Sequence, residues 1–587
     1  MRTRLFAIGR GLRVSLWLAL GAVDAASAQV TPRDLSAQPP RVVSAVARLL
    51  SRPIPGGNAL IEVKVASDEI LPPLITVDLE SGKTTLRDDG KEGDRTSGDR
   101  VYSAIVALDI AAMRRNQARV AQLEGRFGKL VMPVYRGRQR VGRVALSNDF
   151  FAPLVTGTDV VLDKWGFAQA ITEQNSLVIR DVSVVEDPAR TYDPCNNSGT
   201  SMGKWTFGFL MSQIANKNTT GLDPAEFVRQ WIELSRTDQT VNGWDVPAFP
   251  LNWNAILDAW PKLGNGSLDL AKAPFKLLAI VNRVDLRHNV IYGGSNGGEA
   301  RFVFGFKRCS PQSPIPQVTV ILEYGIQAKG CSSIKAWAQQ WQALGNLALG
   351  SAAYLAALET ITDQFSVAGA APTKPNQSAL NQLRTNGGAV PQDWEMREFR
   401  LSSRRLGGSY FALSTVKQTP DSRVVSFSYP FPDDITNYVN DETPAILADQ
   451  HVVPNSYAGR PFLGGVADAQ PPPSGWNLPN VINREARHKF ALQTCNGCHL
   501  LETGTTDFFH IRPPVSGSGT AQLSGFMTGI DVVDPFDASP TRHFDELERR
   551  AVDLDALANS ACIFFVDSNE RFKDFWQQPP IPLNMTH

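Results

Sequence analysis

Two cysteines and a histidine near the end of the chain carry the clearest chemical signal in this sequence. Cys495 and Cys498 lie three residues apart, and His499 directly follows the second cysteine. In this C-x-x-C-H spacing both thiols can add to the vinyl groups of a porphyrin while the histidine ligates its iron. Residues at i and i+3 of a helix project to one side, so both sulfurs can reach one edge of the macrocycle. The motif therefore predicts one covalently attached haem c.

A C-x-x-C pair can also form half of a zinc site or a thiol redox pair. Structural zinc takes four ligands, and the sequence has no second C-x-x-C to complete them. His510 and His543 could contribute, although their spacing matches no familiar zinc finger. A redox-active pair is expected in a βαβ setting, which the flanking residues do not predict. Zinc binding and thiol chemistry remain the alternatives to haem.

The second axial ligand of the predicted iron has two candidates. His510 lies 11 residues beyond His499, and Met527 lies 28 residues beyond it. An imidazole and a thioether set different reduction potentials. A third alternative is an open distal face, which would suit a haem-dependent peroxidase or oxygenase.

The region around the motif resembles the domain of c-type cytochromes. Residues 483–492 have the pattern of a helix that leads into the motif. In cytochrome c domains such a helix delivers C-x-x-C-H, a loop wraps the haem, and a later residue caps the other axial face. The resemblance covers roughly residues 480–560 and is specific at the motif itself. It implies single-electron transfer with a redox partner protein or a small electron donor or acceptor.

The first 28 residues have the pattern of a signal peptide. Four arginines precede an apolar stretch at residues 14–23, and Ala26-Ser27-Ala28 forms a small-residue cleavage site before Gln29. We therefore expect cleavage near Ala28/Gln29 and a mature chain in the periplasm or outside the cell. No later run approaches the ~18 apolar residues of a membrane span, so no transmembrane span is predicted.

Length and charge restrict the possible partners. A chain of 587 residues is too long for one core and predicts about three or four domains. Lys+Arg and Asp+Glu are equal at 58 each, so the chain has no net positive charge that would favour binding of nucleic acid. We predict no nucleic-acid partner.

Four cysteines lie outside the motif, and an oxidising compartment favours disulfides between them. They are Cys195, Cys309, Cys331 and Cys562, and three pairings are possible. Cys309 and Cys331 flank a strand-like run and could close a loop of about twenty residues. Cys195 would then pair with Cys562 and join the middle of the chain to the haem region.

Residues 40–150 predict a small β-sandwich, because short alternating runs are separated by polar turns. The run 88–102 resembles the Asp/Gly-rich loop of immunoglobulin-like modules in bacterial surface and secreted proteins. Its carboxylates could wrap Ca²⁺, although such residues are also ordinary turn formers. These carboxylates are Asp88, Asp89, Asp94 and Asp99. A calcium-stabilised secreted binding or surface protein is therefore an alternative function.

Residues 155–465 predict an α+β domain of unknown role. Apolar runs at 275–281, 301–306 and 318–324 have strand length, and apolar residues that include tryptophan recur at helical spacing in the segments at 223–234 and 334–344. We expect a central sheet covered by tryptophan-rich helices. With a mainly α, cytochrome c-like domain at 480–587, the whole chain is predicted to be a multidomain α+β protein.

The predicted central sheet carries unexpected charge. Glu323 lies inside an apolar strand, Glu299 and Arg301 open another, and Arg283 ends a third. Burying an unpaired carboxylate is costly, so these groups are either paired or functional. One interpretation is an acid–base site of Glu323 and Glu299 positioned by the arginines, next to an open haem face. The other is an ion-pair network that joins three strands.

Overall fold

The computed structural model describes most of the chain from residue 41 to residue 575. The described residues are 41–54, 57–66, 73–79, 82–91, 94, 97–106, 130–136, 139–146, 173–287, 297–307, 309, 317–329, 331–388, 394–402, 407–426, 429–469, 475–505, 507–514, 519–537, 541–558, 563–566 and 572–575. They form two compact units, one from residues 1–169 and 559–579 and the other from the remainder. The predicted signal peptide, Cys562 and the residues beyond 575 lie outside the described part. Within that part, no helix has the length and apolarity to cross a membrane.

The first unit contains a five-stranded antiparallel sheet in the order β1-β2-β5-β4-β3. Its strands are β1 (Arg41–Ile54), β2 (Gly57–Ala66), β3 (Leu74–Leu79), β4 (Gly82–Arg87) and β5 (Val101–Val106). Two separate pairs are β6 (Leu130–Arg136) with β7 (Gln139–Leu146), and β26 (Ile563–Val566) with β27 (Phe572–Phe575).

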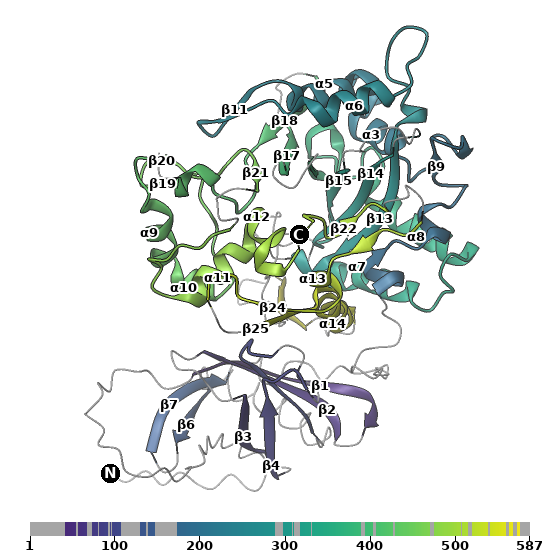
Figure 1. Cartoon of the computed structure of the whole chain (residues 1–587). Helices are drawn as coiled ribbons and strands as arrows, with labels where there is room; N and C mark the ends of the chain where they lie inside the picture. Colours follow the sequence, from purple (N-terminus) through teal and green to yellow (C-terminus); the bar gives the residue numbers. More distant parts are fainter. Residues whose placement is uncertain are drawn as a thin grey trace. The chain divides into compact units, whose positions relative to one another are not determined.

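The second unit is built on a large antiparallel sheet (Figure 1). Its strand order is β18-β17-β16-β15-β14-β13-β8, and β21 pairs with β17 beside this order. The central strands are β13 (Phe275–Arg283), β14 (Glu299–Phe306), β15 (Gln317–Gly325), β16 (Leu380–Gly388) and β17 (Glu395–Leu401). The outer strands are β8 (Val178–Ile179), β18 (Phe411–Ser414) and β21 (Ala467–Asp468). The three apolar runs expected to be strands are β13, β14 and β15, so the α+β class is confirmed.

One face of this sheet is aromatic and is covered by α3 (Phe207–Ala215), α5 (Pro224–Arg236) and α8 (Ala352–Ser366). On α3, the Phe207 ring centroid lies 4.5 Å from that of Phe275 on β13. On α5, Trp231 lies 6.1 Å from Phe399 on β17. The α5 helix starts where its sequence predicts, because the Asp223 side chain accepts hydrogen bonds from the backbone at its N-terminus.

The opposite face is polar and is covered by C-terminal segments. These include α11 (Arg484–Gln493), α12 (Cys495–Cys498), α13 (Gly525–Thr528) and α14 (Glu546–Ala558). Arg287, just after β13, forms an ion pair with Asp553 of α14. On β16, Asn386 donates a hydrogen bond of 3.1 Å to the carbonyl of Phe508. The segment that carries C-x-x-C-H is therefore packed directly on the central sheet.

The remaining helices and strands lie around this core. The helices are α2 (Val182–Val185), α4 (Lys217–Thr220), α6 (Pro250–Ala259), α7 (Cys331–Leu344), α9 (Asp434–Asp441) and α10 (Thr443–Leu447). The strand pairs are β9 (Tyr192–Asp193) with β10 (Ser198–Gly199), β11 (Gln239–Val241) with β12 (Trp244–Val246), β19 (Ser456–Tyr457) with β20 (Arg460–Pro461), β22 (Ile511–Arg512) with β23 (Gln522–Leu523), and β24 (Ile530–Val533) with β25 (Thr541–Phe544).

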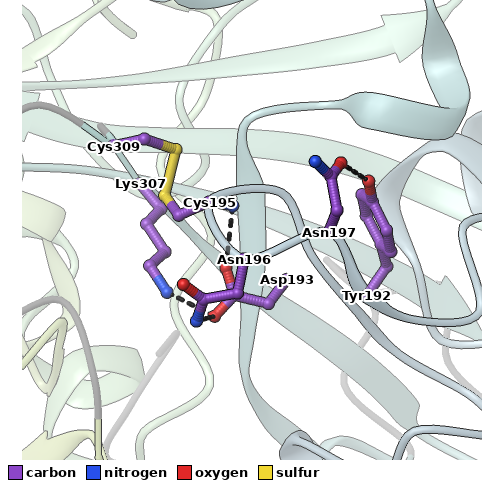
Figure 2. Close-up of a disulfide and its surroundings, with 7 residues drawn as sticks. All are labelled: Tyr192, Asp193, Cys195, Asn196, Asn197, Lys307 and Cys309. Atoms are coloured by element: carbon purple, nitrogen blue, oxygen red, sulfur yellow. Dashed lines mark hydrogen bonds and ion pairs between the residues drawn. A yellow bond between two sulfur atoms is a disulfide. The ribbon is translucent and has the colours of Figure 1, made fainter.

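A disulfide joins Cys195 to Cys309, with Cα atoms 5.0 Å apart (Figure 2). The expected pairs Cys309–Cys331 and Cys195–Cys562 are therefore wrong. The reason is the position of the β9–β10 loop beside the end of β14, where Lys307 forms an ion pair of 2.6 Å with Asp193. Sequence spacing favours short loops, whereas this bridge spans 114 residues.

Candidate functional site

The C-x-x-C-H segment is held in shape by its neighbours. The Thr494 hydroxyl caps α12 by accepting a hydrogen bond of 3.0 Å from Gly497 N, and it donates one of 2.7 Å to the carbonyl of Ala491. The indole of Trp476 donates to both the Thr494 hydroxyl and the Asn496 amide oxygen. A Cβ at Gly497 would lie 1.9 Å from the Ala491 oxygen, so the close approach of α11 and α12 requires glycine here.

Both motif thiols are buried, and neither forms a disulfide. Burial raises the pKa of Cys495 to about 11 and the pKa of Cys498 well above its usual value. Reactive redox cysteines instead have lowered pKa values in partly exposed, electropositive surroundings. Within the described part of the chain, the thiols belong to no set of three potential metal ligands whose atoms lie within 4.8 Å of one another.

His499 has the tautomer of a metal ligand. Its Nδ1 lies 2.7 Å from the carbonyl oxygen of Phe508, which assigns the proton to Nδ1 and the lone pair to Nε2. Burial lowers the pKa of His499 to about 4, so the ring is neutral at pH 7. Trp394 stacks on the His499 ring at 5.7 Å and on Phe508 at 5.0 Å. A carbonyl partner on the second ring nitrogen is typical of ligating histidines.

The central sheet positions this histidine. Asn386 on β16 donates to the Phe508 carbonyl and accepts a hydrogen bond of 2.6 Å from the Trp394 indole. Sequence reasoning missed Asn386 and Trp394, because they lie more than a hundred residues before His499 and form no motif with it. It also missed Phe508, which lies nine residues beyond His499. The only sequence signal is the aromatic pair Phe508-Phe509 after C-x-x-C-H.

Both distal candidates lie near His499. The ring centroid of His510 is 4.4 Å from that of His499, and its Nε2 is 3.3 Å from the Cys498 sulfur. The Nδ1 of His510 lies 2.8 Å from the Ser524 hydroxyl. Met527 on α13 lines the same cavity as both histidines. The structure thus brings together two alternatives that the sequence leaves open.

That cavity has a volume of about 60 Å³ and extends from the histidines to the sheet. Arg283 on β13, Arg301 on β14 and Arg550 on α14 contribute its charged wall. A water needs ~10–15 Å³ by this measure, so the cavity holds several waters or a small functional group. A macrocycle would need the rings of His499 and His510 to separate. The donor set of two neutral thiols and one ligand-ready imidazole fits haem c.

Glu299 and Glu323 lie behind this arginine wall in an ion-pair network. Arg301 is 2.9 Å from Glu299 and 3.3 Å from Glu323, and Arg384 on β16 is 3.7 Å from Glu323 and 3.1 Å from Glu398 on β17. Burial raises the pKa of Glu299, but the charges of Arg301 and Lys417 outweigh it and lower that pKa. These contacts match the ion-pair network that is one of the two interpretations of the sequence. The network extends over four strands.

A second buried network flanks the motif. Arg487 on α11 binds Glu502, which follows the motif, and Asp534 at 2.8 Å. The Nδ1 of the adjacent His488 lies 2.7 Å from Glu502. Three of these side chains, His488, Glu502 and Asp534, bring potential ligand atoms within 4.8 Å of one another, and Arg487 is ion-paired with both carboxylates. This network joins the two segments that enter and leave C-x-x-C-H.

The predicted calcium carboxylates lie in the first unit. Ligand atoms of Asp88, Asp94 and Asp99 lie within 4.8 Å of one another, whereas Asp89 forms an ion pair of 2.6 Å with Arg87. Asp88 accepts hydrogen bonds from the backbone of Gly98, Asp99 and Arg100. Burial raises the pKa of Asp88 to about 6, against the effect of these bonds. These are the bonds of a self-supporting turn.

No protein-family model matches this chain, and comparisons with curated proteins and with solved structures found no significant similarity.

Proposed function

We propose that this chain attaches one haem c through Cys495 and Cys498, with His499 as the proximal iron ligand, and transfers single electrons. The observation that carries the proposal is the combination of a C-x-x-C-H sequence with a neutral His499 whose Nδ1 is held by the Phe508 carbonyl. A bound haem would supply a reversible ferric/ferrous couple. A redox partner protein or a small donor or acceptor would exchange the electron.

The chain's own residues have distinct roles in this proposal. The neutral thiols provide the protons and sulfurs that add to the vinyl groups, and the Thr494 cap keeps both on one turn. Trp394 restricts rotation of the His499 ring. His510 or Met527 would act as the distal ligand, and each would set the potential differently.

The proposal extends to the rest of the chain. Residues 40–150 would form an immunoglobulin-like β-sandwich, and residues 480–587 a mainly α cytochrome c-like domain. With the predicted signal peptide, the protein would work in the periplasm or outside the cell, where covalent haem attachment takes place. In this proposal Ca²⁺ would be an additional, structural ion held by Asp88, Asp94 and Asp99.

The test is covalent attachment. The protein is expressed in a host that matures c-type haem, unfolded in acid, and examined by denaturing electrophoresis with haem detection. We expect the chromophore to stay with the wild-type chain and to be lost from Cys495→Ala/Cys498→Ala. The matched control is Cys195→Ala/Cys309→Ala, which also removes two cysteines but should retain the haem. A wild-type chain without chromophore that contains zinc would overturn the proposal.

A haem-dependent peroxidase or oxygenase is the second candidate. The observation that favours it is the arginine wall of the cavity that also contains His499 and His510, because charged donors beside an iron can assist activation of a bound oxidant. The ferric spectrum separates the two functions. A methionine charge-transfer band, or resistance to cyanide, would favour electron transfer, whereas cyanide binding without loss of a protein ligand would favour catalysis.

A further inference from the structure

Arg283 is a buried side chain with an unpaired donor, and it is one of the residues that line the cavity beside His499. The side chain is fully buried at the end of β13, and its Nε and Nη2 each donate 3.0 Å hydrogen bonds to Asp285. No described residue accepts a hydrogen bond from its Nη1. Arg283 lines the cavity that contains His499. A buried guanidinium donor without an acceptor is costly, so this position calls for an anionic or polar ligand.

The charges next to Arg283 favour an anion. Ion pairs between described residues connect three arginines, Arg283, Arg549 and Arg550, with two carboxylates, Asp285 and Glu546. Burial lowers the pKa of Arg550 to about 9, and the neighbouring charge of Arg283 acts in the same direction. Two carboxylates are thus shared by three guanidinium groups, whereas Arg301, also in the cavity wall, is paired with Glu299 and Glu323.

The rest of the wall restricts the ligand's shape. Val281, Val303 and Ile321 are also cavity-lining residues, and they lie on the same face of the sheet as the arginines because Val281 pairs with Arg301 and Val303 with Ile321. A volume of about 60 Å³ suits a carboxylate on a short alkyl chain better than a phosphate ester or an aromatic acid. The guanidinium can pair with the carboxylate of this ligand, and the branched aliphatic side chains beside it can contact the alkyl chain.

We propose that Arg283, with Arg301 and Arg550, binds the carboxylate of a short aliphatic chain in this cavity. Two sources have this chemistry, namely a propionate side chain of the covalently attached haem and a free short-chain carboxylic acid. The first source rests on the proposed function, whereas the second does not.

The test uses free propionate as the probe, with calorimetric titration of the full chain. Wild-type holoprotein is compared with the thiol-free Cys495→Ala/Cys498→Ala chain, each with and without Arg283→Gln. We expect the thiol-free chain to bind propionate and the Arg283→Gln change to weaken binding at least tenfold. Arg550→Gln should also weaken it, and it leaves Glu546 paired with Arg549 at 2.8 Å. The control is Arg229→Gln on the exposed face of α5, which should have no effect.

The holoprotein distinguishes the sources. Loss of propionate binding on haem attachment assigns the site to a haem propionate, and retained binding assigns it to a free acid. Equal affinity in the Arg283→Gln and parent chains, or no binding by a folded thiol-free chain, overturns the proposal. If the thiol-free chain does not fold, the infrared carboxylate bands of isotopically labelled haem decide instead: Arg283→Gln should shift them, and an unchanged spectrum contradicts the site. If the purified chain carries no haem, the proposed function fails, while the titration still tests the carboxylate site.

Discussion

The two faces of the central sheet are built from opposite kinds of side chain. On one face, Phe302, Phe304 and Tyr324 pack against rings from the covering helices, including Phe207 and Phe365. On the other, arginines and glutamates of four neighbouring strands form ion pairs beneath the C-x-x-C-H segment. Both faces are buried, so the difference is not one of exposure to water.

The aromatic face contributes mainly to stability, and the charged face contributes mainly to the chemistry of the site. Burial of aromatic surface is favourable without precise geometry. Buried ion pairs recover little more than their desolvation cost, so they are weak evidence for stability. The charged face is also the one that orients His499 and lines the cavity.

The aromatic face should be the more sensitive to loss of volume. We expect Trp231→Ala to lower the free energy of unfolding by about 3–5 kcal/mol, because it removes a large buried ring between α5 and β17. Denaturant titration measures this, and the loss should be independent of pH between 3 and 8. Trp231→Phe, which keeps an aromatic ring, should cost much less. A smaller loss of stability than that of Glu398→Gln on the charged face would contradict the comparison.

On the charged face, Glu398→Gln should destabilise by about 3 kcal/mol at pH 7, because it leaves Arg384, Arg400 and Lys417 with less compensation. Burial raises the pKa of Glu398, but those three cations outweigh it and lower the pKa to about 2. A lowered folded-state pKa contributes stability that is present above the unfolded value of 4.5 and is lost as pH falls towards 2. The difference between wild type and variant should therefore shrink over that range, and a constant difference would refute the assignment.

The motif itself depends on a smaller local effect. Thr494→Ala removes the α12 cap and the acceptor of the Trp476 indole, so we expect a loss of about 1 kcal/mol and a lower yield of attached haem. Thr494→Ser keeps the hydroxyl and should restore both. Haem content per chain and denaturant titration provide the measurements. Unchanged haem content in the alanine variant would mean that the cap does not position the thiols.

The smallest effect is expected at a surface ion pair. Arg229→Gln breaks the bond to Glu226 on α5, where both side chains are more than one third exposed. We expect a loss below about 0.5 kcal/mol, removed by high salt. Stability measured at low and high ionic strength checks this. A loss as large as that of Glu398→Gln would remove the distinction between buried and exposed charge.

Local patterns predicted several central elements of the second unit. The runs at 275–281, 301–306 and 318–324 are strands because β-branched and aromatic residues suit a pleated, buried surface. The helix after Asp223 starts as its capping residues require. Strand alternation also places Glu299, Arg301 and Glu323 on a common face, once the register is known.

By itself, the sequence determined the motif, its candidate ligands, three central strands and the helices in the segments at 223–234 and 334–344, since these depend on residue type and short spacing. Only the tertiary structure decided that Cys195 pairs with Cys309, that Asn386 positions the partner of His499, and that Arg283 and Arg550 share its cavity. These contacts join residues more than a hundred positions apart. Their geometry depends on strand order, register and the packing of the C-terminal segments, which no local spacing encodes.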